Sequence, residues 1–159
     1  MLVIAFGILG VVALQAKTAL SQLEGYQRSQ ALFLLNDISA RISLNRQQAA
    51  AYVATNIGTA PIAGDDCESA LTRVAKDLCE WTLALQGAAE VQGGSKVGAM
   101  IAARGCITAV ATDEYLISVA WQGVQATGAP ASSCGQGAYS SEDMRRAVTT
   151  VVHIGRLSP

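Results

Sequence analysis

Histidine, aromatic residues and charge are all scarce in this sequence of 159 residues. His153 is the only histidine, charged residues make up 14%, aromatic residues make up 5%, and the net charge is −1. This composition lacks the basic surface and the stacking residues with which proteins bind nucleic acids. The sequence also has no Cys-x-x-Cys pair, no glycine-rich phosphate loop and no nucleophile motif. We therefore expect no enzyme, no cofactor, no metal site, no nucleic acid partner and no small-molecule substrate.

The first sixteen residues carry no charge, and the first charged residue is Lys17. This apolar run fits a membrane segment, a buried core helix or a secretory signal peptide. A signal peptide requires basic residues before its apolar core, and none precedes this run. The run is also apolar on all sides, which a helix tolerates only in lipid or in a large core. We expect a membrane anchor over residues 1–20, comprising Leu2, Val3, Ile4, Phe6, Ile8, Leu9, Val11, Val12 and Leu14.

A complete membrane span needs about 20 apolar residues, and this run has only about fifteen. We therefore expect that the natural chain begins upstream and that Met1 is an internal methionine. The missing upstream residues would complete the span.

Proline is absent before Pro61, so one helix is predicted from the first residues to about Val53. Beyond Lys17 this helix is amphipathic, because its apolar residues recur at helical spacing. One face is expected to pack on a sheet, through Leu23, Leu34, Leu35, Ile38 and Ile42. Residues 21–159 are thus predicted to form a globular domain from which the first part of the helix protrudes.

The remaining sequence predicts a short second helix and a small sheet. Residues 67–88 place Leu71, Val74, Leu78, Trp81 and Leu85 on one helical face. Two antiparallel strands are predicted over 98–110 and 114–122, where β-branched residues are frequent, and a third strand over 145–155. The fold class is therefore α+β, with a long N-terminal helix packed on an antiparallel sheet of three or four strands.

Five stretches in this order resemble the type IV pilin-like proteins, and most closely the minor pilins of the PilV type. They are MLVIAFGILGVVALQAKTAL, YQRSQALFLLNDISARISLNR, KDLCEW, YLISVAWQG and RRAV, and together they span nearly the whole chain. In the family a basic leader, a Gly-Phe cleavage site and a glutamate precede the apolar segment. These features do not occur in this sequence, so we expect them upstream of Met1, which would lie about ten residues into the mature protein.

The resemblance implies a structural subunit, a minor pilin of a type IV pilus or of its tip and priming complex. It implies an inner-membrane anchor, a periplasmic domain and later a place in the cell-surface pilus, with other major and minor pilin subunits as partners. A minor pseudopilin of a type II secretion system is the closest alternative, and a membrane-tethered periplasmic enzyme is a more distant one. Arg145 and Arg146 are expected either at a solvated strand end or facing a partner subunit.

The four cysteines are Cys67, Cys79, Cys106 and Cys134. An even count beside a membrane-like segment favours disulfides over free thiols or a metal site. Of three possible connectivities we expect Cys67–Cys79 and Cys106–Cys134. A straight helix would hold Cys67 and Cys79 roughly 18 Å apart, so this pairing requires the chain to turn before the second helix begins.

Overall fold

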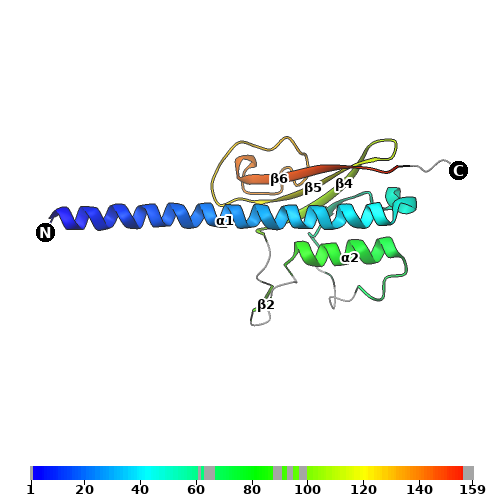
Figure 1. Ribbon diagram of the computed structural model, residues 1–159, viewed down its shortest axis with the longest axis horizontal. Helices are drawn as coiled ribbons and strands as arrows, with labels where there is room; N and C mark the ends of the chain where they lie inside the picture. The colour runs from blue at the N-terminus through cyan, green and yellow to red at the C-terminus, as the bar shows by residue number, and fades with distance from the viewer. Residues whose placement is uncertain are drawn as a thin grey trace.

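In the computed structural model a long helix lies along a four-stranded antiparallel sheet, and a second helix runs beside it (Figure 1). The structure describes residues 2–60, 62, 67–87, 91–92, 95–96 and 100–155, and only the backbone of residues 2–10, 13, 91–92 and 95–96. The elements are α1 (Leu2–Leu44), η1 (Arg46–Tyr52), β1 (Ala54–Ile57), α2 (Arg73–Leu85), β2 (Val91–Gln92), β3 (Ser95–Lys96), β4 (Arg104–Ala111), β5 (Glu114–Gln122), η3 (Glu142–Met144) and β6 (Arg145–His153). The predicted α+β class is confirmed.

Helix α1 spans 43 residues, or about 65 Å, and ends earlier than the sequence predicted. The prediction of one helix to about Val53 is wrong, because the α-helix ends before Asn45 and the chain continues as the 3₁₀ segment η1. The side chain of Asn45 donates a hydrogen bond to the hydroxyl of Tyr52 (3.1 Å), which is fully buried. The helix therefore ends where the chain turns to bring Tyr52 into the core.

The main sheet has the strand order β1-β4-β5-β6, and every neighbouring pair is antiparallel. Strands β5 and β6 pair along their whole length, from Glu114 opposite His153 to Gln122 opposite Arg145. Strand β4 begins at Arg104, later than the predicted residue 98, and residues 98 and 99 lie outside the described residues. Strand β1 is a fourth strand that the sequence did not locate, and it brings the sheet to the upper end of the predicted three or four strands.

The hydrophobic core fills the space between α1 and the sheet. From α1 it includes Leu34, Leu35, Ile38 and Ile42, as the sequence predicted. Leu23 is a correction, since 41% of it is exposed and it is not part of this core. Gln27 is the first buried residue among the described side chains of α1, so Leu23 lies before the covered part of the helix. The sheet contributes Ile107, Tyr115, Ile117, Val119, Trp121, Val148 and Val152.

Helix α2 begins at Arg73 rather than at residue 67, because Thr72 caps it by accepting a hydrogen bond from the N–H of Ala75 (3.1 Å). Its position is fixed by Trp81, which is fully buried and donates its indole N–H to the carbonyl of Leu34 on α1 (2.9 Å). The ring lies against Gly105 of β4, where a Cβ atom would come within 2.3 Å of it. Leu71 precedes the helix and is fully exposed, contrary to the predicted apolar face.

Both expected disulfides are present, so the predicted connectivity is confirmed. The Cα atoms are 5.6 Å apart in Cys67–Cys79 and 5.8 Å apart in Cys106–Cys134. Cys67 lies six residues before α2 and Cys79 lies within it, so the chain makes the turn that this pairing requires. The second bridge joins β4 to the long connection between β5 and β6.

Candidate interaction surface

The N-terminal part of α1 extends well beyond the sheet (Figure 1). Val11, Val12 and Leu14 are the described residues of the expected anchor, and more than half of each is exposed. The side chains of Leu2, Val3, Ile4, Phe6, Ile8 and Leu9 lie outside the described residues. Across the described side chains, no helical stretch has both the length and the apolarity that crossing a membrane requires.

A row of exposed apolar residues continues along the part of α1 that lies over the domain. This row was not predicted from the sequence. Positions spaced alternately by four and three residues form a row that we call the α1 seam, and eight of its ten members are apolar. All eight apolar members are exposed, including Phe33 at 69% and Leu44 at 85%. The seam consists of Val12, Ala16, Ala19, Leu23, Tyr26, Gln30, Phe33, Asp37, Ala40 and Leu44.

This spacing averages 3.5 residues, which is the repeat of helices that pack side by side in a left-handed coiled coil. The seam therefore drifts around a straight helix by about 20° per heptad. Its two polar members are satisfied within the chain, because the Gln30 amide donates to the hydroxyl of Tyr26 (3.1 Å) and Asp37 pairs with Arg41 (3.0 Å). The seam thus presents apolar side chains to a neighbouring helix without leaving charge unpaired.

Glu24 attaches α1 to the sheet at the point where the helix leaves the domain. Its carboxylate accepts a hydrogen bond from the backbone N–H of Val124 (2.9 Å) and pairs with the guanidinium of Arg146 (3.2 Å). Arg146 also donates to the carbonyl of Asp143 (3.0 Å). The expectation that Arg146 lies at a solvated strand end or faces a partner is therefore corrected, since its charge fixes the helix to β6.

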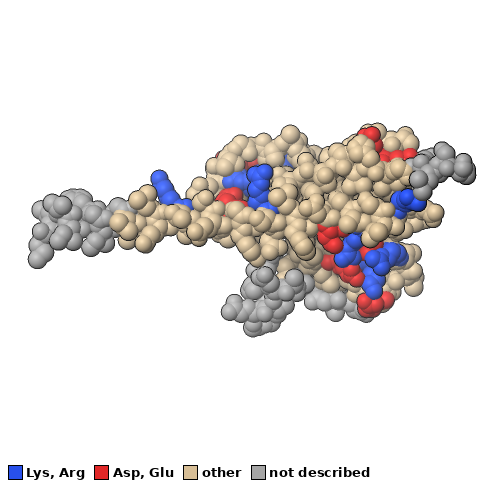
Figure 2. Space-filling model, viewed as in Figure 1, with Lys and Arg blue, Asp and Glu red and all other residues tan. Residues whose placement is uncertain are grey.

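A second group of charges joins α1 to α2. Asp77 is almost fully buried, accepts a hydrogen bond from the hydroxyl of Tyr52 (2.5 Å) and pairs with Arg41 (3.1 Å). Burial lowers the pKa of Arg41, but its hydrogen bonds to Glu80 and Asp77 and the charge of Asp37 together raise the pKa above the ordinary value. Figure 2 shows charged side chains gathered over α2 and the adjoining part of α1. These charges stabilise the packing of the two helices.

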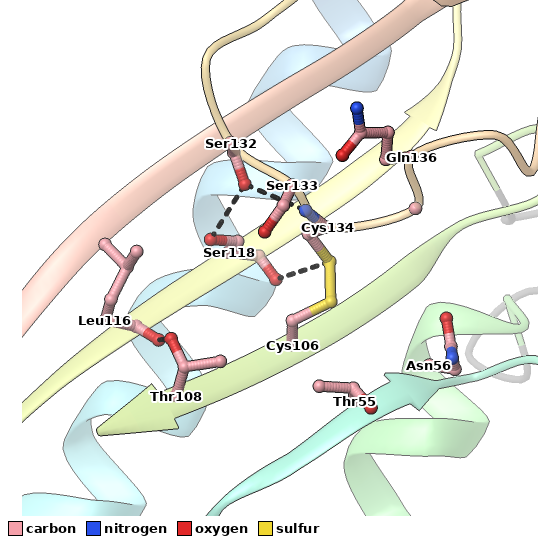
Figure 3. A pocket seen from close by; sticks show the side chains of 11 residues that line it. Thr55, Asn56, Cys106, Thr108, Leu116, Ser118, Ser132, Ser133, Cys134 and Gln136 are labelled. Carbon is pink, nitrogen blue, oxygen red and sulfur yellow. Dashed lines mark hydrogen bonds between the residues drawn. A yellow bond between two sulfur atoms is a disulfide. The ribbon is translucent and has the colours of Figure 1, made fainter. Parts of the chain in front are cut away.

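The face of the sheet opposite α1 carries a cavity of about 220 Å³ (Figure 3). It lies between β1, the Cys106–Cys134 disulfide and residues 132–136. The hydroxyl of Ser132 bonds to that of Ser118 (3.3 Å) and accepts the N–H of Cys134 (3.2 Å). None of the described residues that line the cavity carries a charge. The lining residues are Thr55, Asn56, Cys106, Thr108, Leu116, Ser118, Ser132, Ser133, Cys134, Gly135 and Gln136.

Arg145 is covered by the long connection between β5 and β6 and is only 2% exposed. Its guanidinium donates to the carbonyls of Pro130 (3.3 Å), Ser132 and Cys134 (3.2 Å). It also pairs with Glu142, and the hydrogen bond from Arg145 lowers the pKa of that carboxyl. The expectation of a solvated or partner-facing Arg145 is therefore wrong, because the long connection folds over it.

The described residues contain no group of three or more His, Cys, Asp or Glu side chains placed to hold a metal ion. His153 is largely exposed, with its Nδ1 3.2 Å from a carboxylate oxygen of Glu114. The candidate surface is the exposed apolar part of α1, whose 3.5-residue spacing suits binding to another helix.

Comparison with known proteins gives no match, whether to family models, to curated proteins or to solved structures.

Proposed function

We propose that this chain is a structural minor pilin of a type IV pilus. In this proposal α1 anchors it in the inner membrane, with the domain in the periplasm, until it joins the pilus or its tip and priming complex. One observation carries the proposal: α1 extends far beyond its own domain, and its apolar side chains find no cover there. The sequence resemblance to the minor pilins supports the same role.

The energetics of α1 favour a buried final state for its exposed side chains. Burying one exposed Val, Leu or Phe side chain contributes roughly 1.5–3 kcal/mol, and the α1 seam offers four such large apolar residues and Tyr26 in one row. Before assembly, lipid covers the first part of this row. In a fibre, the helices of other pilin subunits cover it, and Ala16, Ala19 and Ala40 leave room for a close approach.

The domain has a different task in this proposal, which is to present α1 in a fixed direction. The ion pair between Glu24 and Arg146 holds the helix where it leaves the sheet, and the Arg41–Asp77 pair holds its other end to α2. The partners are other major and minor pilin subunits and the inner membrane. The chain needs no cofactor and no small-molecule substrate for this work.

The substitution Val12→Asp tests the proposal, with Thr18→Asp as its matched control. Val12 belongs to the α1 seam, whereas Thr18 lies outside the seam and follows Lys17 at the polar end of the expected anchor, where the chain already carries a charge. An acidic residue in the centre of a membrane-spanning helix costs about 2.5–3.5 kcal/mol on insertion scales; Val12 lies nearer the end of the expected span, where the charge also enters the α1 seam. We expect Val12→Asp to lower the amount of chain in the membrane and fibre fractions at least tenfold, and Thr18→Asp to leave it within twofold.

Both variants are produced at equal levels as full chains in pilus-bearing cells, and tryptophan fluorescence verifies that the core around Trp81 and Trp121 is formed. Recovery of Val12→Asp in both fractions at the wild-type level would contradict the proposal.

A further inference from the structure

The two edges of the main sheet differ in how well they are protected from pairing with another strand. Strand β1 has only four residues, its register with β4 shifts, and Asn56 adopts a left-handed backbone with φ 59°. Strand β6 has nine residues and pairs with β5 without any irregularity. It contains no proline and no lysine, and residues 148–152 are all β-branched. Proteins normally block open edges with such devices, and residues 147–153 of β6 have none of them.

The hydrogen bonds at both ends of the β5–β6 ladder show which backbone groups of β6 point outward. The N–H of Gly123 donates to the carbonyl of Met144 (2.8 Å), and the N–H of Ile154 donates to that of Asp113 (2.8 Å). Hydrogen-bonded pairs alternate along an antiparallel ladder, so even-numbered residues of β6 bond to β5. The N–H and C=O groups of Thr149, Val151 and His153 therefore point away from the sheet.

These outward groups have no partner in the part of the chain that the structure describes. The connection between β5 and β6 covers only the start of the edge, where the N–H of Thr127 donates to the carbonyl of Asp143 (2.8 Å). Farther along, the side chains of Thr149, Val151 and His153 are exposed. A row of regularly spaced donors and acceptors is complementary to the main chain of an extended peptide.

We propose that the β6 edge is a docking site for an extended segment of a different protein, which adds to the sheet as a fifth strand along residues 147–153. The β-branched side chains at Thr149 and Val151 favour a segment with β-branched or aromatic residues opposite them. Main-chain hydrogen bonds supply the affinity, and these side chains supply the selectivity.

A second copy of this chain is a poorer occupant, an argument that rests on the proposed function. Strand β6 runs in the same direction as α1 (Figure 1). If two β6 edges paired antiparallel across a twofold axis, the two α1 helices would point in opposite directions, which one membrane or one polar fibre does not allow. Pairing of β6 with β1 of another copy is limited by the short and irregular β1.

Amide hydrogen exchange of the full chain in detergent micelles tests the edge without any fibre. The probe is the β5 sequence EYLISVAWQ with flanking lysines, because this segment already pairs with β6 in the sheet. Without the probe, the amides of Thr149, Val151 and His153 should exchange at least 100-fold faster than those of Val148, Thr150 and Val152. Saturating probe should slow the three outward amides at least tenfold.

Two further measurements separate strand addition from side-chain binding. Val151→Pro removes one outward N–H and should weaken binding of the probe at least tenfold, whereas Val151→Thr keeps the N–H and should bind within threefold. With the unaltered protein, two probes N-methylated at alternate residues in the two possible phases should differ, since only one edge of an added strand faces β6. Equal binding of the two methylated probes would overturn the proposal.

The proposal is also overturned if the outward amides are protected in the dilute chain alone, or if their protection appears only as the chain is concentrated. The latter result would identify a second copy as the occupant. A failure of the edge in these measurements leaves the pilin proposal standing. A working edge with Val12→Asp assembled normally would overturn the pilin proposal alone.

Discussion

At the scale of single residues, the packing of α2 depends on Gly105 of β4 having no side chain. Trp81 reaches the backbone of α1 because Gly105 leaves space for its ring on β4. A β-carbon at residue 105 would push the Trp81 ring away from β4 and disturb its hydrogen bond to α1. Gly25 is the opposite case, since a Cβ atom added there meets nothing within 4 Å.

Gly105→Ala should therefore lower the free energy of unfolding by about 1–3 kcal/mol, the usual cost of overpacking a core. Gly25→Ala, in contrast, should raise it by up to about 1 kcal/mol, because alanine favours a helix more than glycine does. Urea denaturation of the two variants, followed by tryptophan fluorescence, measures both changes. Loss of stability in both variants, or in neither, would contradict this account of Trp81.

The residues that the sequence could not place are mainly charged ones whose surroundings come from distant segments. Arg145 and Arg146 begin a strand, and nothing nearby in the sequence indicates that one is covered by carbonyls of residues 130–134 and the other pairs with Glu24. By contrast, the burial of Trp81, Leu34, Ile38 and Ile42 followed from their helical spacing. Local periodicity predicts which face of α1 is apolar, but tertiary packing decides how far along the helix that face is covered, as the exposed Leu23 and the buried Gln27 illustrate.

At the scale of elements, the sequence located α1, α2 and three strands of the main sheet but missed β1 and the end of α1. Both errors have one cause, which is that these features depend on tertiary contacts. Residues 54–57 pair with β4 although Asn56 and Gly58 read as a turn. The helix ends at Leu44 because Tyr52 must reach Asp77 on α2. The α1 seam was present in the sequence as a 3.5-residue repeat, overlooked beside the stronger pattern of the core face.

The connection between β5 and β6 owes its order to three attachments: the Cys106–Cys134 disulfide, Arg145 and Tyr139. The hydroxyl of Tyr139 donates to the carbonyl of Ala102 (3.2 Å), its ring lies beneath the guanidinium of Arg104, and burial raises its pKa to about 12. Of the two disulfides, Cys106–Cys134 closes the longer loop, with a sequence separation of 28 against 12, so it restricts the unfolded chain more strongly.

Replacing Cys106 and Cys134 together by alanine should lower the free energy of unfolding by roughly 3.5 kcal/mol, against roughly 3 kcal/mol for Cys67 and Cys79, in the chain-entropy model. Hydrogen exchange should separate the two pairs more clearly. The first replacement should expose amides of residues 124–140, and the second should expose those of 67–79. Unchanged exchange of residues 124–140 without the Cys106–Cys134 bridge would show that Arg145 and Tyr139 hold the connection unaided.

At the scale of the whole molecule, the structure combines a helix with an exposed apolar face and a domain whose apolar side chains pack in its own core. The ion pairs of Glu24 and Arg41 use the charges beside α1 to fix its direction. The α1 seam stays exposed, and in the proposed function lipid or other subunits cover it. Strand β6 offers a separate edge on the sheet. An exposed helix on a self-contained domain is consistent with the proposed role as a structural subunit.

The most direct test of the central claim is to measure the chain in fibres sheared from cells that produce it with an epitope tag at its C-terminus. The account predicts that the tagged full chain is recovered in the purified fibres, at a low ratio to the main subunit, and that the unassembled remainder is in the inner-membrane fraction. Recovery of the chain only as a free protein, with none in the fibres or the membrane, would contradict it.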